Sequence, residues 1–341
     1  MDSYHQEKLH HTPWIEKYRP KNLSDVSSQD QSIAILKQTI KSGNLPHMLF
    51  YGPPGTGKTS TILALAKELF GPNLYKSRVL ELNASDERGI SIVREKIKNF
   101  ARLQISNPTV QDLESYPCPP FKIIILDEAD SMTNDAQSAL RRIIENYSNI
   151  TRFVLICNYI TRIIDPLASR CSKFRFKLLN SENSLNRLRY ISDVENLNIE
   201  EDVLMKILSI SQGDLRKAIT YLQSSSKLSN MNDDDDKITI EKIEEIAGVL
   251  PDKTIDGLVD LIMKKRVNDI VGFINDLVLE GWSIQQLIDQ LHDNLLLDDK
   301  VDTRFKNQIS LLLLDCDKKL NNGTDEHIQL LNLVLQISKI V

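Results

Sequence analysis

Residues 52–59 read Gly52-Pro53-Pro54-Gly55-Thr56-Gly57-Lys58-Thr59 and match the phosphate-binding P-loop pattern at every position. The apolar run Met48–Tyr51 precedes this loop and a helical pattern begins at Ser60, which is the context that the motif requires. The glycines let successive backbone N–H groups turn towards phosphate oxygens, and the helix N-terminus adds the positive end of its dipole. Lys58 is expected to reach the β- and γ-phosphates, and the Thr59 hydroxyl is expected to bind Mg²⁺. The loop therefore predicts a site for a nucleoside triphosphate with Mg²⁺.

A second pattern of reactive residues follows a buried strand. The apolar run Ile123–Leu126 leads directly into Asp127-Glu128-Ala129-Asp130. Carboxylates at the C-terminal end of a strand lie where parallel α/β sheets bind their ligands. We expect Asp127 to hold Mg²⁺ through water, Glu128 to polarise an attacking water and Asp130 to orient the loop. The letters Asp-Glu-Ala-Asp also suggest an RNA helicase, but neither a downstream Ser-Ala-Thr nor a second RecA-like half follows, so we set that class aside.

The first half of the chain alternates apolar runs with amphipathic stretches. Continuous apolarity is typical of strands that are covered on both faces, as in a parallel sheet. The expected strands are Met48–Tyr51, Val79–Leu82, Ile123–Leu126 and Phe153–Ile156, and the expected helices are Ile33–Ser42, Ser60–Phe70, Ser91–Leu103 and Ala136–Tyr147. Strand patterns stop after about residue 177, and the spacing of apolar residues is helical from there onwards. The alternation predicts an α/β domain followed by helical parts.

Composition places the chain among globular proteins of two or three domains. It has 341 residues, of which 41% are hydrophobic and 26% are charged, and its net charge is −5. Residues 1–200 carry 26 Lys and Arg against 22 Asp and Glu, whereas residues 201–341 carry 16 against 25. The total excludes a chain that is basic throughout, and any contact with a polyanion is expected in the first 200 residues.

The sequence argues against a membrane protein and against a zinc site or a disulfide framework. No stretch reaches the ~18–20 uninterrupted apolar residues of a membrane span, and the polar first residues contain no signal-peptide core. The four cysteines, Cys118, Cys157, Cys171 and Cys316, are scattered without a Cys-x-x-Cys pair. Free thiols favour a reducing compartment, either the cytosol or the nucleus.

Three further positions are less specific when they are judged by spacing alone. Asn158 closes the strand after the acidic one, where an amide can hydrogen-bond a γ-phosphate or its water, although Asn often only caps a strand. Arg170 stands in a Ser-Arg-Cys triplet and is equally compatible with a surface ion pair. Gly213 and Asp214 fit a helix C-cap and the next N-cap, which leaves Arg216 without a structural explanation.

Taken in order, these motifs resemble the small subunits of AAA+ clamp loaders, and among these the replication factor C family. The ordered set comprises the P-loop, Asp127-Glu128-Ala129-Asp130, Asn158, Ser169-Arg170-Cys171 and Gly213-Asp214-Leu215-Arg216. Three further stretches resemble family motifs: Trp14-Ile15-Glu16-Lys17-Tyr18-Arg19-Pro20, Leu82-Asn83-Ala84-Ser85-Asp86-Glu87-Arg88-Gly89-Ile90 and Cys157-Asn158-Tyr159-Ile160-Thr161-Arg162-Ile163-Ile164. The similarity runs from about residue 12 to the C-terminus, and no ATPase position departs from the family pattern.

The resemblance implies a three-part architecture of the α/β class. A polar leader over residues 1–11 would precede a RecA-like P-loop AAA+ domain with a parallel sheet over 12–176, a small helical lid over 177–250 and an all-helical collar over 251–341. In the family, the collars hold five subunits in an open ring, and ATP lies between subunits. The collar is therefore expected to be the oligomerisation domain.

The resemblance also implies roles for the residues of an ATP site. The catalytic residues at the chain's own nucleotide would be Lys58, Asp127, Glu128, Asn158 and Arg216. Thr59 and Asp127 would bind Mg²⁺. Arg170, also catalytic, would be an arginine finger that reaches the neighbouring subunit's nucleotide. The adenine end would be lined by Ile15, Arg19 and Val26, and the rest of ATP would be bound by Gly52, Pro53, Pro54, Gly55, Thr56, Gly57, Lys58, Thr59, Ser60, Asn158 and Arg216. Arg88, Arg94 and Arg162 match positions that line the family's DNA channel, although without the resemblance they read as solvated surface arginines.

The function that the resemblance implies is that of an ATP-hydrolysing clamp-loader subunit. Such a subunit would join other loader subunits in a heteropentamer that opens the sliding clamp PCNA and loads it on primer–template DNA in the nucleus, for DNA replication and repair. The segment Gln104–Pro120 lies where family members approach the clamp. Two alternatives stay open: another AAA+ DNA motor or helicase loader, and a nucleotide-binding scaffold subunit without turnover. The second alternative predicts loss of Lys58 or Glu128, and both are present.

Overall fold

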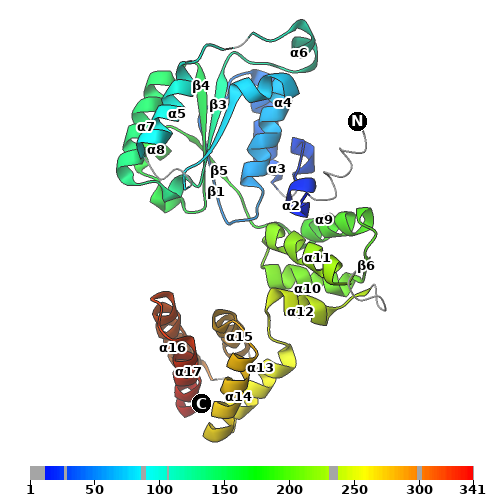
Figure 1. The fold of residues 1–341 in the computed structure, drawn as a ribbon. Coiled ribbons are helices and arrows are strands. Elements are labelled where there is room, and N and C mark those ends of the chain that lie inside the picture. Colours follow the sequence, from blue (N-terminus) through cyan, green and yellow to red (C-terminus); the bar gives the residue numbers. More distant parts are fainter. Residues whose placement is uncertain are drawn as a thin grey trace. The chain divides into compact units, whose positions relative to one another are not determined.

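The computed structural model describes residues 12–26, 29–85, 90–105, 107–229, 237–297 and 302–340 (Figure 1). The chain divides into two compact units. The first comprises Met1–Leu197 and Ile207–Gln223, and the second comprises Asn198–Lys206 and Ser224–Val341. Each unit has its own hydrophobic core, and the candidate site lies in the first unit.

The first unit is built around a five-stranded sheet. Its strands are β1 (Met48–Tyr51), β2 (Val79–Asn83), β3 (Lys122–Asp127), β4 (Thr151–Cys157) and β5 (Ser172–Arg175). They run parallel in the order β2-β3-β4-β1-β5. This order places β1, which leads into the P-loop, next to β4 and one strand away from β3. The predicted α/β class with a parallel sheet is confirmed.

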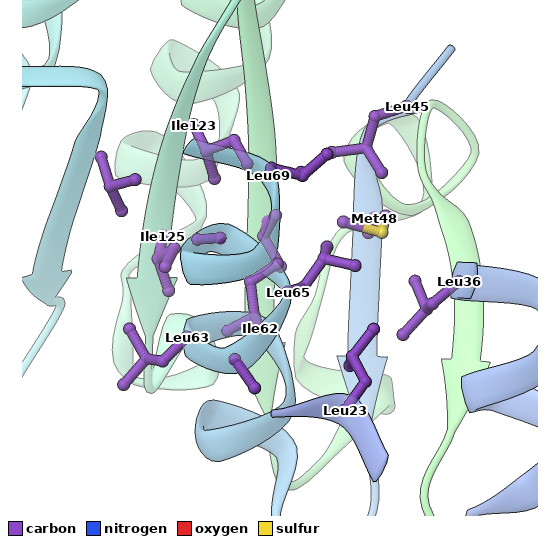
Figure 2. Close-up of a cluster of buried hydrophobic side chains, with 14 of the residues drawn as sticks. Leu23, Leu36, Leu45, Met48, Ile62, Leu63, Leu65, Leu69, Ile123 and Ile125 are labelled. Carbon is purple, nitrogen blue, oxygen red and sulfur yellow. The ribbon is translucent and has the colours of Figure 1, made fainter. Parts of the chain in front are cut away.

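Alternate residues of the central strands face opposite layers of the core. Ile123 and Ile125 of β3 belong to one buried cluster, which Figure 2 shows, and Ile124 and Leu126 belong to another. The helices that cover the two faces are α3 (Asp30–Ser42) and α4 (Lys58–Arg78) on the first, and α5 (Ile90–Arg102), α7 (Asn134–Tyr147) and α8 (Asp165–Ala168) on the second (Figure 1). Burial on both faces explains why these strands are apolar without interruption.

The helix that follows the P-loop is broken once. Within α4, Gly71 has a φ of 62° and a ψ of 177°, which are not helical, and Pro72 follows it. A Cβ at Gly71 would lie 2.5 Å from Cε2 of Tyr116, so this position needs glycine for space as well as for conformation. The predicted helix end at Phe70 therefore marks this break, and helical residues continue beyond it to Arg78.

Among the described elements of the first unit that the sequence-based assignment lacks are the strand β5 and the short helix α6. β5 reads Ser-Lys-Phe-Arg, and of these four residues only Phe174 is buried. Because β5 is an edge strand, it lacks the continuous apolar run by which the central strands are identified. The segment Gln104–Pro120, which shows little pattern in the sequence, contains the short helix α6 (Val110–Ser115).

Helices dominate after the sheet, but the expectation that no further strands follow is wrong. The helices are α9 (Ser181–Val194), α10 (Glu201–Ser211), α11 (Leu215–Ser229) and α12 (Ile240–Ala247). The strands β6 (Asn198–Ile199) and β7 (Lys237–Ile238) pair as a parallel ladder of two residues each. Strands this short carry no periodicity that a sequence pattern can reveal.

In its described part, the second unit contains five consecutive helices around one core. They are α13 (Asp252–Met263), α14 (Val267–Leu279), α15 (Ile284–Leu297), α16 (Thr303–Asn321) and α17 (Glu326–Ile340). The terminal helix α17 packs against α13–α16 and buries Leu330, Leu333 and Val334, while Ile328 remains 62% exposed. Its apolar sequence is thus largely explained by burial within its own unit. Among the described residues, no helix combines the length and apolarity needed to cross a bilayer.

Candidate nucleotide-binding site

The candidate site is built where neighbouring strands end. β1 leads into the P-loop, whose residue Gly57 caps the N-terminus of α4 with a left-handed φ of 86°. β3 ends at Asp127, and β4 is followed directly by Asn158. Because β3, β4 and β1 are adjacent and parallel, their carboxyl ends lie at the same edge of the sheet. The fold thus brings together residues from three separate parts of the sequence.

Lys58 is buried and links the P-loop to the end of β4. Its Nζ donates to the carbonyl oxygens of Gly52 at 2.8 Å and Pro53 at 2.7 Å, and to Oδ1 of Asn158 at 2.9 Å. An ammonium group has three protons, so a phosphate oxygen would have to replace one of these acceptors. Burial lowers the pKa of Lys58; nearby Asp127 opposes this shift, and Arg216 adds to it. A phosphate bound between Lys58 and Arg216 would relieve the repulsion of the two cations.

Thr59 and Asp127 bring two oxygen atoms that can act as metal ligands side by side. The Thr59 hydroxyl donates to Oδ2 of Asp127 at 2.7 Å, with Thr59 buried and Asp127 half-buried. Mg²⁺ prefers oxygen ligands, and proteins commonly bind it with one or two side chains together with phosphates and water. A hydroxyl and a carboxylate at this separation fit that ion.

Glu128 has an uncommon backbone conformation. Its φ of 53° and ψ of 38° are left-handed, and its N–H donates to Oδ1 of Asp127 at 2.9 Å. Few residues other than glycine adopt this conformation, and backbone strain of this kind is concentrated at functional sites. The exposed carboxylate of Glu128 follows directly after Asp127, whose carboxylate can bind a cation. This arrangement suits a group that orients water.

Asp130 connects the ends of β3 and β4. Its Oδ2 accepts the backbone N–H groups of Asn158 and Tyr159, both at 3.1 Å. Asn158 is therefore held through its backbone by Asp130 and through its side chain by Lys58. Asp130 thus orients the loop that follows β4.

A cavity of about 390 Å³ opens beside the P-loop, and its volume is in the range of small-molecule sites. It is lined by Ile15, Glu16, Tyr18, Arg19, Pro20, Asp25, Val26, Gly55, Thr56, Gly57, Ser60, Leu179, Arg187, Leu215, Arg216 and Ile219. The predicted binding residues in this wall are Ile15, Arg19, Val26, Gly55, Thr56, Gly57, Ser60 and Arg216. The others, Gly52, Pro53, Pro54, Lys58, Thr59 and Asn158, belong to the adjoining P-loop and strand ends.

Two P-loop glycines leave no room for a side chain. A Cβ at Gly52 would lie 2.1 Å from the carbonyl oxygen of Phe176, and one at Gly55 would lie 2.0 Å from Oδ1 of Asp214. The same Asp214 oxygen accepts the N–H of Arg216 at 2.9 Å, which confirms the predicted N-cap role of Asp214 at the start of α11. The close approach at Gly55 therefore lets the P-loop and the start of α11 share one cavity wall.

Sequence reasoning missed the network that attaches the N-terminal segment, which includes the short helix α2 (Trp14–Lys17). Lys17 Nζ and the Tyr18 hydroxyl both donate to Oε1 of Glu195, at 2.6 and 2.5 Å, and Arg187 donates to the carbonyl oxygen of Tyr18 at 2.6 Å. Burial raises the pKa of Tyr18, and the hydrogen bond to Glu195 adds to the shift. Two residues of this network, Lys17 and Tyr18, belong to the sequence motif Trp14–Pro20. Arg187 and Glu195 lie in and just after α9, where no motif marks them.

The proposed trans arginine lies apart from the cavity wall. Arg170 is exposed just after α8, and its contacts within the described chain are with Glu145 and the carbonyl oxygen of Pro166. Arg216, in contrast, lines the cavity beside the P-loop.

The three arginines expected to contact DNA are described to different extents. Arg162 is exposed at the end of the turn η3 (Ile160–Arg162), with its guanidinium 5.2 Å from the centre of the Tyr159 ring. Arg88 lies outside the described residues, and Arg94 belongs to α5 without a described side chain.

Three family models match successive parts of the chain. The ATPase family associated with various cellular activities (AAA) matches residues 48–179, the RCF1/5-like AAA+ ATPase lid domain matches 186–227, and the Replication factor C C-terminal domain matches 250–336. Their order agrees with the predicted AAA+ domain, helical lid and helical C-terminal part. The residue numbers at which we place the domain boundaries stay predictions.

Relatives match the chain along nearly its whole length. Replication factor C subunit 2 of Saccharomyces cerevisiae is 60% identical over 335 residues, which cover 98% of this chain and 95% of the relative. Replication factor C subunit 4 of Homo sapiens is 50% identical over 321 residues, with coverage of 94% and 86%. The Replication factor C small subunit of Aeropyrum pernix is 41% identical over 322 residues, with coverage of 93% of each chain. The predicted resemblance to clamp-loader small subunits is confirmed.

Solved structures support the fold independently. The Thermotoga maritima RuvB Holliday junction branch migration motor matches with a TM-score of 0.52 and 16% identity, over 80% of this chain and 91% of that chain. At this level of identity the likeness concerns the fold alone.

Proposed function

This chain belongs to the replication factor C family of AAA+ ATPases, and from that premise we propose that it is an ATP-hydrolysing subunit of a heteropentameric clamp loader. The complex would open the sliding clamp PCNA and load it on primer–template DNA for replication and repair. The observation that carries this proposal is the similarity to replication factor C subunits along almost the whole chain, including the C-terminal helical part. Relatives of this kind in Saccharomyces cerevisiae and Homo sapiens support a nuclear location.

ATP binding is assigned to the cavity and the adjoining strand ends. Ile15 and Val26 would contact the adenine end, while Lys58 and Arg216 would neutralise the phosphates. Thr59 and Asp127 would hold Mg²⁺, which supplies further neutralisation of phosphate charge when it is bound. The hydrogen bond between the Thr59 hydroxyl and Asp127 supports this assignment, because it brings both oxygen ligands to one point.

Hydrolysis is assigned to Glu128 and Asn158. Phosphoryl transfer depends mainly on positioning and on electrostatic stabilisation, so the chain must orient one water and hold the γ-phosphate. Glu128 would polarise that water, and Asn158 would hydrogen-bond the γ-phosphate or the water. The contacts of Asn158 with Lys58 and Asp130 support this role, because they hold the amide beside the P-loop.

Arg170 is assigned to the nucleotide of the neighbouring subunit. Arg216 already provides a guanidinium at the chain's own cavity, whereas Arg170 is exposed after α8. An arginine supplied by a neighbour makes hydrolysis depend on assembly, as arginine fingers do in other ATPases and GTPases. The ring and the ATPase site would thus be completed together.

DNA binding is assigned to phosphate contacts of Arg88, Arg94 and Arg162. Changing all three to Ala should weaken DNA binding by a similar factor for every sequence, because phosphate contacts carry no base information. The slope of log K against log salt should shrink by up to about 3, since each lost duplex phosphate contact removes about 0.9. Binding titrations of the assembled complex at several salt concentrations measure both effects.

The matched control for the DNA variant removes three positive charges elsewhere. Lys264, Lys265 and Arg266 form the longest basic run and lie in the net-acidic part of the chain. Their change to Ala should leave the salt slope unaltered. An unchanged slope in the triple variant of Arg88, Arg94 and Arg162 would identify these three as ordinary surface charges.

The alternative functions have weaker support. A branch-migration motor shares the fold, but the identity to that structure is far below the identity to replication factor C subunits. A scaffold subunit without turnover would not need the complete set of Lys58, Asp127 and Glu128, which this chain retains.

A reconstituted loading reaction tests the proposed function. The chain is purified together with its native partner subunits, and the complex is incubated with PCNA, ATP and primed circular DNA. We expect a complex of five subunits by mass and PCNA that remains on the DNA after gel filtration, with retention lost when this chain carries Lys58→Ala. A complex that migrates branched DNA and retains no PCNA would favour a different AAA+ motor.

A further inference from the structure

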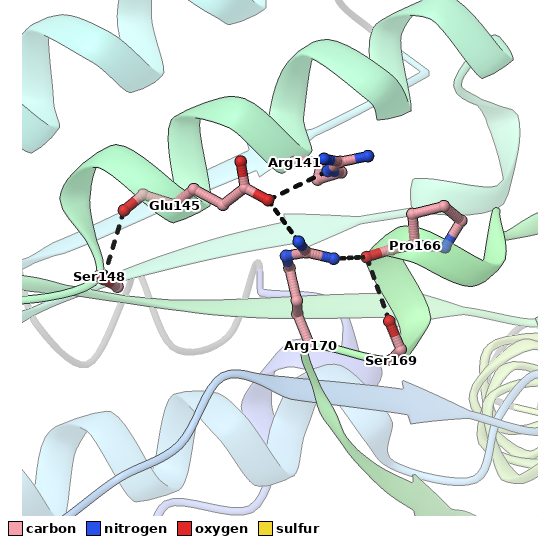
Figure 3. Close-up of polar contacts among 6 residues, drawn as sticks. All are labelled: Arg141, Glu145, Ser148, Pro166, Ser169 and Arg170. Carbon is pink, nitrogen blue, oxygen red and sulfur yellow. Dashed lines mark hydrogen bonds and ion pairs between the residues drawn. The ribbon is translucent and has the colours of Figure 1, made fainter.

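A charge cluster lies beside Arg170, and none of the roles proposed above uses it (Figure 3). Arg170 Nη2 donates to Oε1 of Glu145 at 2.5 Å, and its Nη1 donates to the carbonyl oxygen of Pro166 at 2.6 Å. The same Glu145 oxygen accepts a hydrogen bond from Nε of Arg141 at 3.1 Å. Glu145 thus connects one turn of α7 with the arginine that follows α8.

The position of Glu145 in its helix is electrostatically unfavourable. It lies in the last turn of α7, where the negative end of the helix dipole repels a carboxylate. Arg141 and Arg170 offset this repulsion, and the hydrogen bond from Arg141, with a further contribution from Arg170, lowers the pKa of Glu145. The carboxylate is therefore ionised at neutral pH and available to the guanidinium of Arg170.

The two backbone elements that carry the acceptors contacting Arg170, α7 and α8, are anchored in the protein core. Ile144, next to Glu145, and Leu167, next to Pro166, belong to the same buried cluster, and α7 packs directly against α8. Because protein cores are close-packed, the backbones of α7 and α8 are expected to keep a fixed separation. The guanidinium is therefore held from two directions.

The cluster restrains Arg170 without using all of its donors. A guanidinium group has five N–H donors in a planar fork, and the two contacts described above use one on each terminal nitrogen. The Arg170 side chain remains 36% exposed. It can therefore keep both contacts and still present donors to a phosphate.

We propose that Glu145 is a positioning residue that holds the Arg170 guanidinium in the orientation from which it reaches the neighbouring subunit's γ-phosphate. This inference rests on the trans role of Arg170 in the proposed function. A long side chain that is restrained beforehand loses less freedom when it engages the reacting group. An exposed ion pair is weak, so Glu145 would not withhold Arg170 from a nearby triphosphate.

The test measures hydrolysis at the neighbouring subunit's site in an assembled complex in which the other sites are inactivated. Glu145→Ala should lower kcat there by about 3- to 10-fold, the cost of leaving one long side chain unrestrained, and should leave the KM for ATP unchanged. Glu145→Gln keeps an acceptor oxygen and should recover most of the loss. The matched control, Asp135→Asn, removes an exposed acid from the first turn of α7 and should have no effect.

A double variant separates positioning from a structural effect. Adding Glu145→Ala to Arg170→Ala should cause no further loss, because Glu145 would act only through Arg170. A further loss of hydrolysis in that background, or a loss of hydrolysis at this chain's own site, would show a structural role of Glu145. A higher kcat in Glu145→Ala would show that Glu145 keeps Arg170 away from the nucleotide. Either result overturns the inference. If Arg170→Ala cripples the neighbour's site and Glu145→Ala leaves it unchanged, the inference fails while the proposed function stands. If Arg170→Ala itself has no effect, the trans role fails first.

Discussion

A complex in which this chain carries Glu128→Gln should bind ATP at the affected site and hydrolyse it about 10²–10⁴-fold more slowly, the range that a positioned general base contributes. The amide has nearly the shape of the carboxylate but cannot take a proton from the attacking water. The contacts of Lys58 and the pair formed by Thr59 and Asp127 do not involve the Glu128 side chain, so nucleotide binding should persist. Single-turnover hydrolysis and ATP binding are measured in complexes whose other sites are inactivated.

The matched control for Glu128 is Glu245→Gln. It makes the same chemical change at an exposed position of α12, outside the residues assigned to the site. Hydrolysis should then equal that of the unmodified complex. Undiminished hydrolysis in Glu128→Gln would remove Glu128 from the catalytic assignment.

Arg170→Ala should leave this chain's own site active and slow hydrolysis at the neighbour's site by about 10³–10⁵-fold, the range observed for arginine fingers. The expected asymmetry rests on the proposed trans role of Arg170, and it agrees with the geometry of this chain, in which Arg216 lines the cavity and Arg170 contacts Glu145 and Pro166 instead. The decisive measurement follows turnover site by site in complexes of defined composition, each with one hydrolysing site.

Two further variants sharpen the test of Arg170. Arg170→Lys should fail nearly as badly as Ala, because a lysine is a point charge without the planar fork that binds phosphate in a bidentate manner. Arg175→Ala removes an exposed arginine of β5 and is the matched control. If the isolated chain hydrolyses ATP briskly and Arg170→Ala abolishes that activity, the arginine acts in cis and the ring mechanism loses its main support.

Much of the local structure could be predicted because it depends on short stretches of sequence. The P-loop needs glycines and a lysine at fixed spacing, so its chemistry is evident from eight consecutive residues. Doubly covered strands need unbroken apolar runs, and β1 occupies the predicted residues Met48–Tyr51. The predicted helices Ile33–Ser42 and Ala136–Tyr147 likewise end at the residues where α3 and α7 end. In each case the determining interactions lie within one turn, strand or helix face.

The tertiary structure decided which of these segments meet. Periodicity does not specify the strand order, yet that order brings Asn158 within 2.9 Å of Lys58, across 100 residues of chain. The tertiary structure also contains β5, whose residues lack an apolar run because the strand is at an edge of the sheet. The contact of Glu145 with Arg170 likewise joins elements that no motif connects. The physical reason is that such contacts depend on which faces of distant elements become buried together, and this follows from the packing of the whole chain rather than from any local pattern.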